Sequence, residues 1–105
     1  MIKKLLFISF LFLSIAVFSQ KTLQKLTAAP NPFATKTNIK FTSTKNQIVF
    51  FVVKNMIGKS VYIKKHSVKK GKNQLPFYRN NLQAGMYIYT IQSQKETISK
   101  RFVIQ

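Results

Sequence analysis

Five lysines gather in the short stretch KKHSVKKGK, and they are Lys64, Lys65, Lys69, Lys70 and Lys72. Ammonium groups this close together bind phosphate and other anionic groups without sequence selectivity, and such binding weakens as salt rises. Tyr62, Tyr78 and Arg79 lie nearby in the sequence. The tyrosines occur at the strand period expected of core residues, so stacking on nucleic-acid bases is not implied. The stretch therefore predicts a basic patch for anionic polymers, with no specific nucleic acid as partner. A solvated face that serves solubility is the alternative.

Groups for other chemistry are scarce, because the chain holds one acidic residue, one histidine and no cysteine. Paired carboxylates and a Ser/His/Asp triad are thus excluded, and no spacing favours a Ser/Lys dyad. Glu96 and His66 are too few to hold zinc, and His66 is expected to lie exposed at the end of a basic strand. Gly58, Gly71 and Gly85 are too scattered for a phosphate-binding loop. We expect no catalytic, cofactor-binding or metal-binding residues, and no enzyme.

The first 20 residues have the layout of a secretory leader. Two lysines precede an apolar run from Leu5 to Phe18, and the small residue Ser19 follows. This layout predicts a signal peptide over residues 1–19, cleaved between Ser19 and Gln20. The apolar run is shorter than the roughly 20 residues of a membrane-spanning helix, so we expect no transmembrane segment in the mature chain. The absence of cysteine excludes a lipid-anchored lipoprotein and any disulfide framework.

The chain that follows the leader is short and strongly basic. The full sequence has 18 basic residues. Lys3 and Lys4 leave with the leader, so 16 remain against Glu96 alone, a formal charge of +15. Such a surface attracts acidic partners. The chain is also rich in Phe, Val, Ile and Tyr, which favour strands and can bury a core. We therefore expect one folded domain that carries the charge on its surface.

Period-two alternation of apolar and polar residues predicts the fold class. Ile39 and Phe41 alternate with polar residues, as do Tyr87, Tyr89 and Ile91. Short strands separated by turn signals indicate an all-β sandwich or barrel. Seven strands are expected, at Leu23–Ala29, Thr37–Thr42, Gln47–Lys54, Lys59–Lys65, Asn73–Tyr78, Gly85–Gln92 and Thr97–Ile104.

Two segments refine this prediction. Ile48–Val53, IVFFVV, is apolar at every position, so its strand should be central and covered on both faces, or present one face to a partner. Leu82, Gly85 and Tyr87 have the spacing of a tyrosine corner, in which the ring packs inside and the hydroxyl bonds to nearby backbone. The second segment favours an immunoglobulin-like sandwich.

Five motifs in order along the chain carry a resemblance to a known family. They are Pro30-Asn31-Pro32-Phe33; Thr37, Ile39 and Phe41; Asn55 with Gly58-Lys59; Leu82, Gly85 and Tyr87; and Lys100-Arg101-Phe102 followed by Val103 and Ile104. In this order the chain resembles the type A C-terminal sorting domain of the type IX (Por) secretion system of Bacteroidetes. The resemblance covers roughly Leu26 to Gln105.

The resemblance implies a seven-stranded immunoglobulin-like sandwich at residues 27–105, preceded by a short linker at 20–26. It implies passage through the inner membrane, folding in the periplasm and docking on the outer-membrane translocon. A surface sortase then removes such domains and attaches their cargo to anionic lipopolysaccharide, so the expected location is secreted or at the cell surface. Pro30 and Pro32 are expected to open the first strand at an edge. Asn55 replaces the usual Asp and keeps an oxygen that can close the turn.

The short stretch from Gln20 to about Lys25 leaves little room for cargo between leader and domain. We therefore expect a truncated gene, a small secreted product in its own right, or cargo on a separate chain. This keeps an alternative function open. The chain would then be a stand-alone cationic secreted protein that binds lipopolysaccharide, polysaccharide or extracellular DNA.

Overall fold

A computed structural model describes residues 21–105, which form seven strands. They are β1 (Leu23–Ala29), β2 (Lys36–Ser43), β3 (Gln47–Lys54), β4 (Ser60–Val68), β5 (Gly71–Tyr78), β6 (Gly85–Gln92) and β7 (Thr97–Ile104). Every predicted strand is present. The largest difference is that β4 ends at Val68 rather than Lys65, because the Val68 side chain is buried in the core. The predicted leader and its cleavage site lie outside the described residues.

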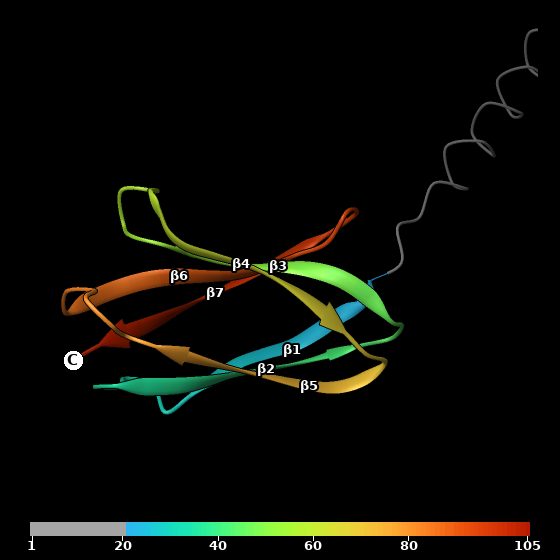
Figure 1. Ribbon diagram of the computed structural model, residues 1–105, viewed down its shortest axis with the longest axis horizontal. Helices are drawn as coiled ribbons and strands as arrows, with labels where there is room; N and C mark the ends of the chain where they lie inside the picture. The colour runs from blue at the N-terminus through green and yellow to red at the C-terminus, as the bar shows by residue number, and fades with distance from the viewer. Residues whose placement is uncertain (1–20) are drawn as a thin grey trace, which may run out of the picture.

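The strands form two antiparallel sheets, which face each other in Figure 1. One sheet has the order β1-β2-β5, and the other has the order β4-β3-β6-β7. The prediction of a seven-stranded, immunoglobulin-like sandwich is confirmed. Apolar and polar residues alternate in the sequence because successive side chains of a strand point to opposite faces of the sheet.

An aromatic cluster fills the space between the sheets. The ring of Phe102 stacks on Tyr89 at 5.0 Å between centroids, and on Phe77 at 5.5 Å. Phe77 meets Phe51 edge to face at 5.7 Å. Rings in these arrangements add attraction to the burial of their apolar surface. The core therefore depends on residues from β3, β5, β6 and β7 together.

Strand β3 is central in its sheet, between β4 and β6, as predicted. Its inward side chains, among them Phe51 and Val53, are buried. Its outward side chains are only partly covered, since Val52 is 6% exposed but Ile48 is 52% exposed and Phe50 is 44% exposed. Of the two alternatives predicted for this strand, coverage of both faces is thus wrong at Ile48 and Phe50, because the sandwich has only two layers. The other alternative, a face presented to a partner, stays a prediction.

Both outer edges of the three-stranded sheet are irregular. Edge strand β1 has a bulge between Gln24 and Thr27, where Lys25 has a φ of 58°. Edge strand β5 contains Pro76, which has no N–H to offer a further strand. These features interrupt the regular row of hydrogen-bonding groups that an edge otherwise presents.

The strand register sorts the connections into two ends of the sandwich. One end, which we call the motif end, holds the connections 30–35, 55–59 and 79–84 together with Gln105. The other end, which we call the lysine end, holds Thr22 and the connections 44–46, 69–70 and 93–96. In Figure 1 the motif end lies at the left, beside the C-terminus.

Candidate functional site

The first and last motifs of the sequence meet at the motif end. The Asn31 side chain donates from Nδ2 to the carbonyl of Arg101 at 3.2 Å, and its Oδ1 accepts from the N–H of Val103 at 2.9 Å. Phe33 continues the pairing, donating its N–H to the Val103 carbonyl at 3.0 Å and accepting from Gln105 at 2.8 Å. Residues 31–33 thus bind the free edge of β7, and we call this arrangement the clasp.

The two prolines lie in the clasp rather than at the start of a strand. Strand β1 ends at Ala29, so the expectation that Pro30 and Pro32 open the first strand is wrong. They shape the connection that brings Asn31 to β7, and the buried Thr37 side chain donates to the Pro30 carbonyl at 2.7 Å. Strand β1 itself begins at Leu23, within the stretch 20–26 that the resemblance assigns to a linker, because Leu23 is a core residue.

Arg79 joins several segments of the motif end. Its guanidinium donates to the carbonyl oxygens of Leu82 at 2.9 Å and of Ala34 at 3.4 Å, and also to Gln105. The sequence suggested that Arg79 lies near the basic patch, which is wrong, because β5 carries it to the opposite end. No local signal identifies it, since its partners come from three separate segments.

The predicted tyrosine corner is confirmed. Tyr87 is 7% exposed, and its hydroxyl donates to the carbonyl of Gln83 at 2.7 Å. Its ring lies 6.3 Å from that of Phe102, and Leu82 packs against the core. Gly85 has a φ of +149°, in a region that side-chain-bearing residues rarely adopt, which explains the glycine at the start of β6. These residues fix the connection 79–84 beside the end of β7.

The turn between β3 and β4 is closed by Asn55, as predicted. Its Oδ1 accepts from the N–H groups of Ile57 at 3.2 Å and Lys59 at 2.9 Å. Gly58 has a φ of +88° and donates to the Asn55 carbonyl at 3.0 Å. The amide oxygen therefore closes this turn without a carboxylate. Lys59 is exposed beside it.

The last motif divides between surface and core. Phe102 is fully buried and meets Phe33 edge to face at 5.1 Å. Lys100 and Arg101, which precede it, are exposed. Strand β7 therefore presents cationic side chains beside the motif end, on a framework of aromatic packing and backbone pairing.

The predicted basic patch lies away from the motif end. Lys69, Lys70 and Lys72 are exposed around the turn between β4 and β5, at the lysine end. Lys64 and Lys65 are adjacent on β4, so their side chains leave opposite faces of the strand. The five lysines are thus spread over β4, the turn that follows it and the start of β5 rather than gathered on one surface.

The neighbours assigned to the patch have other surroundings. Tyr62 packs in the core, with its ring 5.2 Å from that of Phe77, whereas Tyr78 is half exposed with the Lys36 ammonium 5.6 Å from its ring. His66 is half-buried, so the expectation that it is exposed is wrong. Burial, and secondarily the charge of Lys64, lower the pKa of His66 below 6.5.

Glu96 has a structural role at the lysine end. Its Oε1 accepts from the N–H of Thr22 at 2.7 Å and also from the Thr22 hydroxyl, which in turn accepts from Gln47 at 3.1 Å.

Within residues 21–105, no three side chains of the types that bind metals lie together. The same part of the chain contains no helix long and apolar enough to cross a membrane.

The fold and the motif end together define the class of the protein, a small two-sheet β-sandwich held by packing and backbone pairing. A family comparison agrees with this class. The chain belongs to the secretion system C-terminal sorting domain family, which matches residues 27–105. This membership shows a role in secretion sorting, in a family of targeting signals rather than enzymes, and it implies interaction with the secretion system and export to or beyond the cell surface.

Comparison with solved structures shows the fold alone. The chain is similar to a β-glucosidase from intestinal bacteria involved in saponin metabolism, at 12% identity with a TM-score of 0.51. It is similar to a β-glucosidase from Kluyveromyces marxianus, also at 12% identity, with a TM-score of 0.50. In both cases 84% of this chain is covered, but it spans only 16% and 15% of the enzymes. No curated protein matches the chain.

Proposed function

We propose that the chain is a sorting domain whose folded motif end is recognised by the type IX outer-membrane translocon, which directs it to the cell surface. The clasp is the observation that supports this most, because it joins the first and last motifs into one surface. A receptor that contacts this surface can read whether the domain is complete and folded.

The proposal gives the motif residues two kinds of role. Asn31, Phe33, Tyr87 and Phe102 hold the motif end in shape, as their contacts indicate. The exposed cations carry the contact with the translocon, and they are Lys59, Lys100 and Arg101. The remaining motif residues shape the connections of the motif end, and they are Pro30, Pro32, Asn55, Gly58, Leu82 and Gly85.

The rest of the pathway is also part of the proposal. Residues 1–19 act as the leader, with cleavage between Ser19 and Gln20, and residues 27–105 form the sorting domain. After export, a surface sortase acts on the domain, with anionic lipopolysaccharide as a further partner. The family membership supports the sorting role from which these steps are extended.

The experiment compares export of reporter fusions. Deleting Lys100–Gln105 is expected to leave the reporter in the periplasm, because the deletion removes the end of β7 and the partners of the clasp. Replacing Lys100 and Arg101 by Gln keeps the strand and is expected to reduce export while the domain stays protease-resistant. Replacing Lys69 and Lys70 by Gln at the lysine end is the matched control, and its export should be unchanged. Equal export of all four fusions would contradict the proposal.

A second function has independent support. Lys69, Lys70 and Lys72 are exposed at the end opposite the motif end, so they can bind an anionic polymer without obstructing it. In this alternative the chain is a cationic secreted protein that binds lipopolysaccharide, polysaccharide or extracellular DNA. Binding of this kind should weaken steeply between low and physiological salt. A flat response to salt would exclude it.

A further inference from the structure

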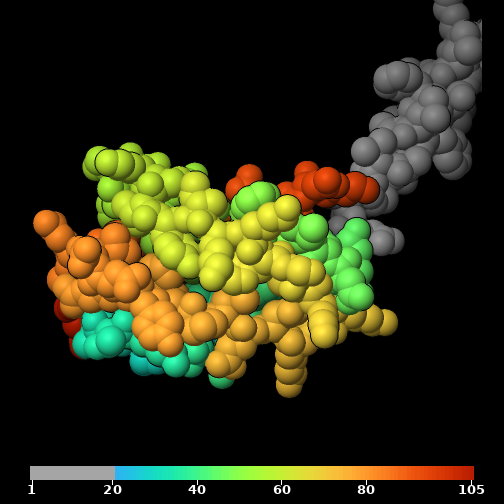
Figure 2. Space-filling view, in the orientation of Figure 1, coloured from blue at the N-terminus to red at the C-terminus, as the bar shows by residue number. Residues whose placement is uncertain are grey.

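The turn between β3 and β4 exposes two large apolar side chains next to each other. Ile57 is 87% exposed and Met56 is 54% exposed. Lys54 and Lys59 flank them on either side. The turn, coloured yellow-green, rises from the outer face of the four-stranded sheet and stands above the neighbouring surface (Figures 1 and 2). An apolar tip between cations is an amphipathic arrangement that sorting by itself does not explain.

Four N–H groups of this turn are already hydrogen-bonded within it. The N–H groups of Ile57 and Lys59 bond to the Asn55 side chain, and that of Gly58 bonds to the Asn55 carbonyl. The Asn55 N–H bonds to the Lys59 carbonyl at 2.9 Å. Unpaired amides are costly in an environment without water, because nothing there replaces the lost partner. This tip can therefore enter such an environment without breaking its own bonds.

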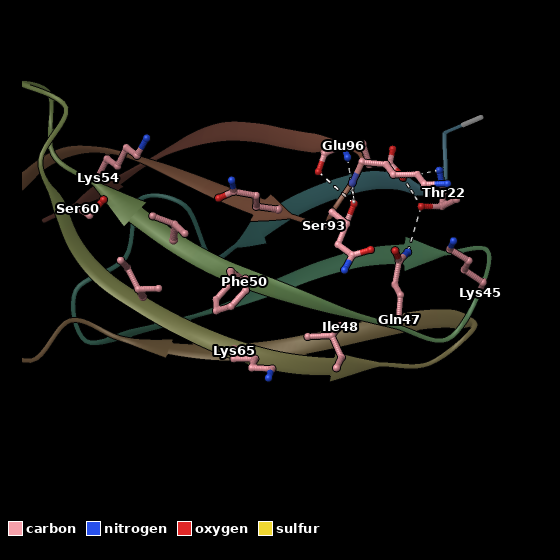
Figure 3. Close-up of a pocket in the computed structure, with 15 residues that line it drawn as sticks. Thr22, Lys45, Gln47, Ile48, Phe50, Lys54, Ser60, Lys65, Ser93 and Glu96 are labelled. Carbon is pink, nitrogen blue, oxygen red and sulfur yellow. Dashed lines mark hydrogen bonds between the residues drawn. The ribbon is translucent and has the colours of Figure 1, made fainter. Parts of the chain in front are cut away.

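The sheet behind the tip is hollowed. A groove of about 920 Å³ runs along the outer face, with Phe50 and Ile48 on its floor and Lys54, Lys65 and Lys45 around it (Figure 3). The turn between β6 and β7 rises on the same side of the molecule (Figure 1). A broad surface that rests on the raised turns does not reach the floor of the groove. The tip is thus the part that meets such a surface first.

We propose that the β3–β4 turn inserts Met56 and Ile57 into the interface of an anionic lipid bilayer, with Lys54 and Lys59 on the headgroup phosphates. A bilayer fits because it yields to a projecting apolar tip while its phosphates match cations on both sides. The charge of the chain agrees, since its one acidic side chain, Glu96, lies at the opposite end. This inference goes beyond sorting and does not depend on it.

The test measures binding to lipid vesicles. The protein is purified after export, and its mass is measured to check that the leader has been removed. Vesicles of phosphatidylcholine with about 30% phosphatidylglycerol are compared with pure phosphatidylcholine. The protein should sediment with the anionic vesicles only. The double variant Met56→Ser and Ile57→Ser should bind about tenfold more weakly, since two apolar side chains stay in water. Each of Lys54→Gln and Lys59→Gln should weaken binding about fivefold.

A fluorescent probe locates the contact without depending on affinity. The chain contains no tryptophan, so Ile57→Trp introduces a single reporter at the tip. Its emission should shift to the blue with anionic vesicles, because the indole leaves water. Ile48→Trp, on the groove floor, is the matched control and should not shift. Ile48→Ser should bind as the parent does.

Three outcomes would overturn the proposal: no binding to anionic vesicles, unchanged binding by the Met56 and Ile57 double variant, or a blue shift at position 48 and not at 57. If the vesicles do not bind but the double variant blocks reporter export, the tip contacts a protein of the secretion system instead. That result would reject the lipid and leave the sorting proposal intact, so the two can fail separately.

Discussion

Single residues differ in how far they reach along the chain for their partners. Asn55 and Tyr87 bond to backbone within four positions, whereas Asn31 bonds to residues 70 and 72 positions away. The first two roles were predictable because the motif and its partner lie in one window of sequence. Those of Asn31, Arg79 and Glu96 were not, because no local pattern states which distant strand ends beside them.

Loss of the Asn31 side chain should weaken the clasp. We expect Asn31→Ala to lower the free energy of unfolding by about 1 kcal/mol, since two hydrogen bonds at a partly solvated site are lost. Asn31→Asp retains the acceptor for the Val103 N–H but loses the donor to Arg101, so its effect should be smaller. Urea unfolding of the three proteins measures the order. An alanine variant as stable as the parent would show that the clasp adds nothing to stability.

His66 should make stability depend on pH. Its pKa is below 6.5 in the folded chain, owing first to burial and then to Lys64, so the unfolded chain takes up the proton first. The contribution of His66 to the free energy of unfolding is therefore fully present above about pH 7. It falls as the pH drops through 6.5 toward the folded-state pKa. His66→Gln should flatten this part of the profile, measured by urea midpoints between about pH 5 and 7.5. A variant profile parallel to that of the parent would exclude His66 as the cause.

At the scale of elements, β7 is the strand that connects most of the structure. It pairs with β6 along its whole length on one side and receives the clasp on the other. Its existence and bounds follow from alternation in the sequence, and so does the inward direction of Phe102. The sequence did not decide whether β3 is covered on both faces or leaves one partly uncovered, because an apolar run contains no period that tells a buried face from an exposed one.

Truncation of Phe102 should show how much β7 contributes. We expect Phe102→Ala to lower the free energy of unfolding by about 3–5 kcal/mol, because it leaves a cavity among Phe33, Phe77 and Tyr89. Val103→Ala, at a partly exposed neighbour, is the control and should cost about 1 kcal/mol or less. Chemical denaturation provides both values. Similar losses for the two variants would mean that the aromatic cluster is loosely packed.

For the molecule as a whole, the main result is that the sorting motifs and the turn lysines of the basic patch lie mostly at opposite ends of the sandwich. The order of strands places four connections and termini at each end. Four of the five motifs lie at or beside the motif end, the second motif runs along β2 toward the other end, and three lysines of the basic patch lie at the lysine end. The sandwich class could be predicted from strand count and turn spacing. The separation could not, because it depends on which strands pair, and that is a long-range property of the chain.

The position of a fused reporter should therefore matter. A reporter joined before Thr22 lies at the lysine end, and we expect it to be exported. A reporter joined after Gln105 lies at the motif end, where Arg79 and Phe33 bind the last residue, and its export should fall several-fold. The measurement is reporter activity on intact cells and in the periplasm. Equal export from both fusions would argue that recognition takes place elsewhere on the domain.

The irregular margins of the three-stranded sheet bear on the behaviour of the protein in bulk. A kinked margin at Lys25 and an imino acid at Pro76 offer a neighbouring copy no straight row to extend. Chains that accumulate in a crowded compartment can then stay separate instead of polymerising through this layer. Straightening either margin, rather than altering the interior, would be the change that lets copies of the domain pair into fibres.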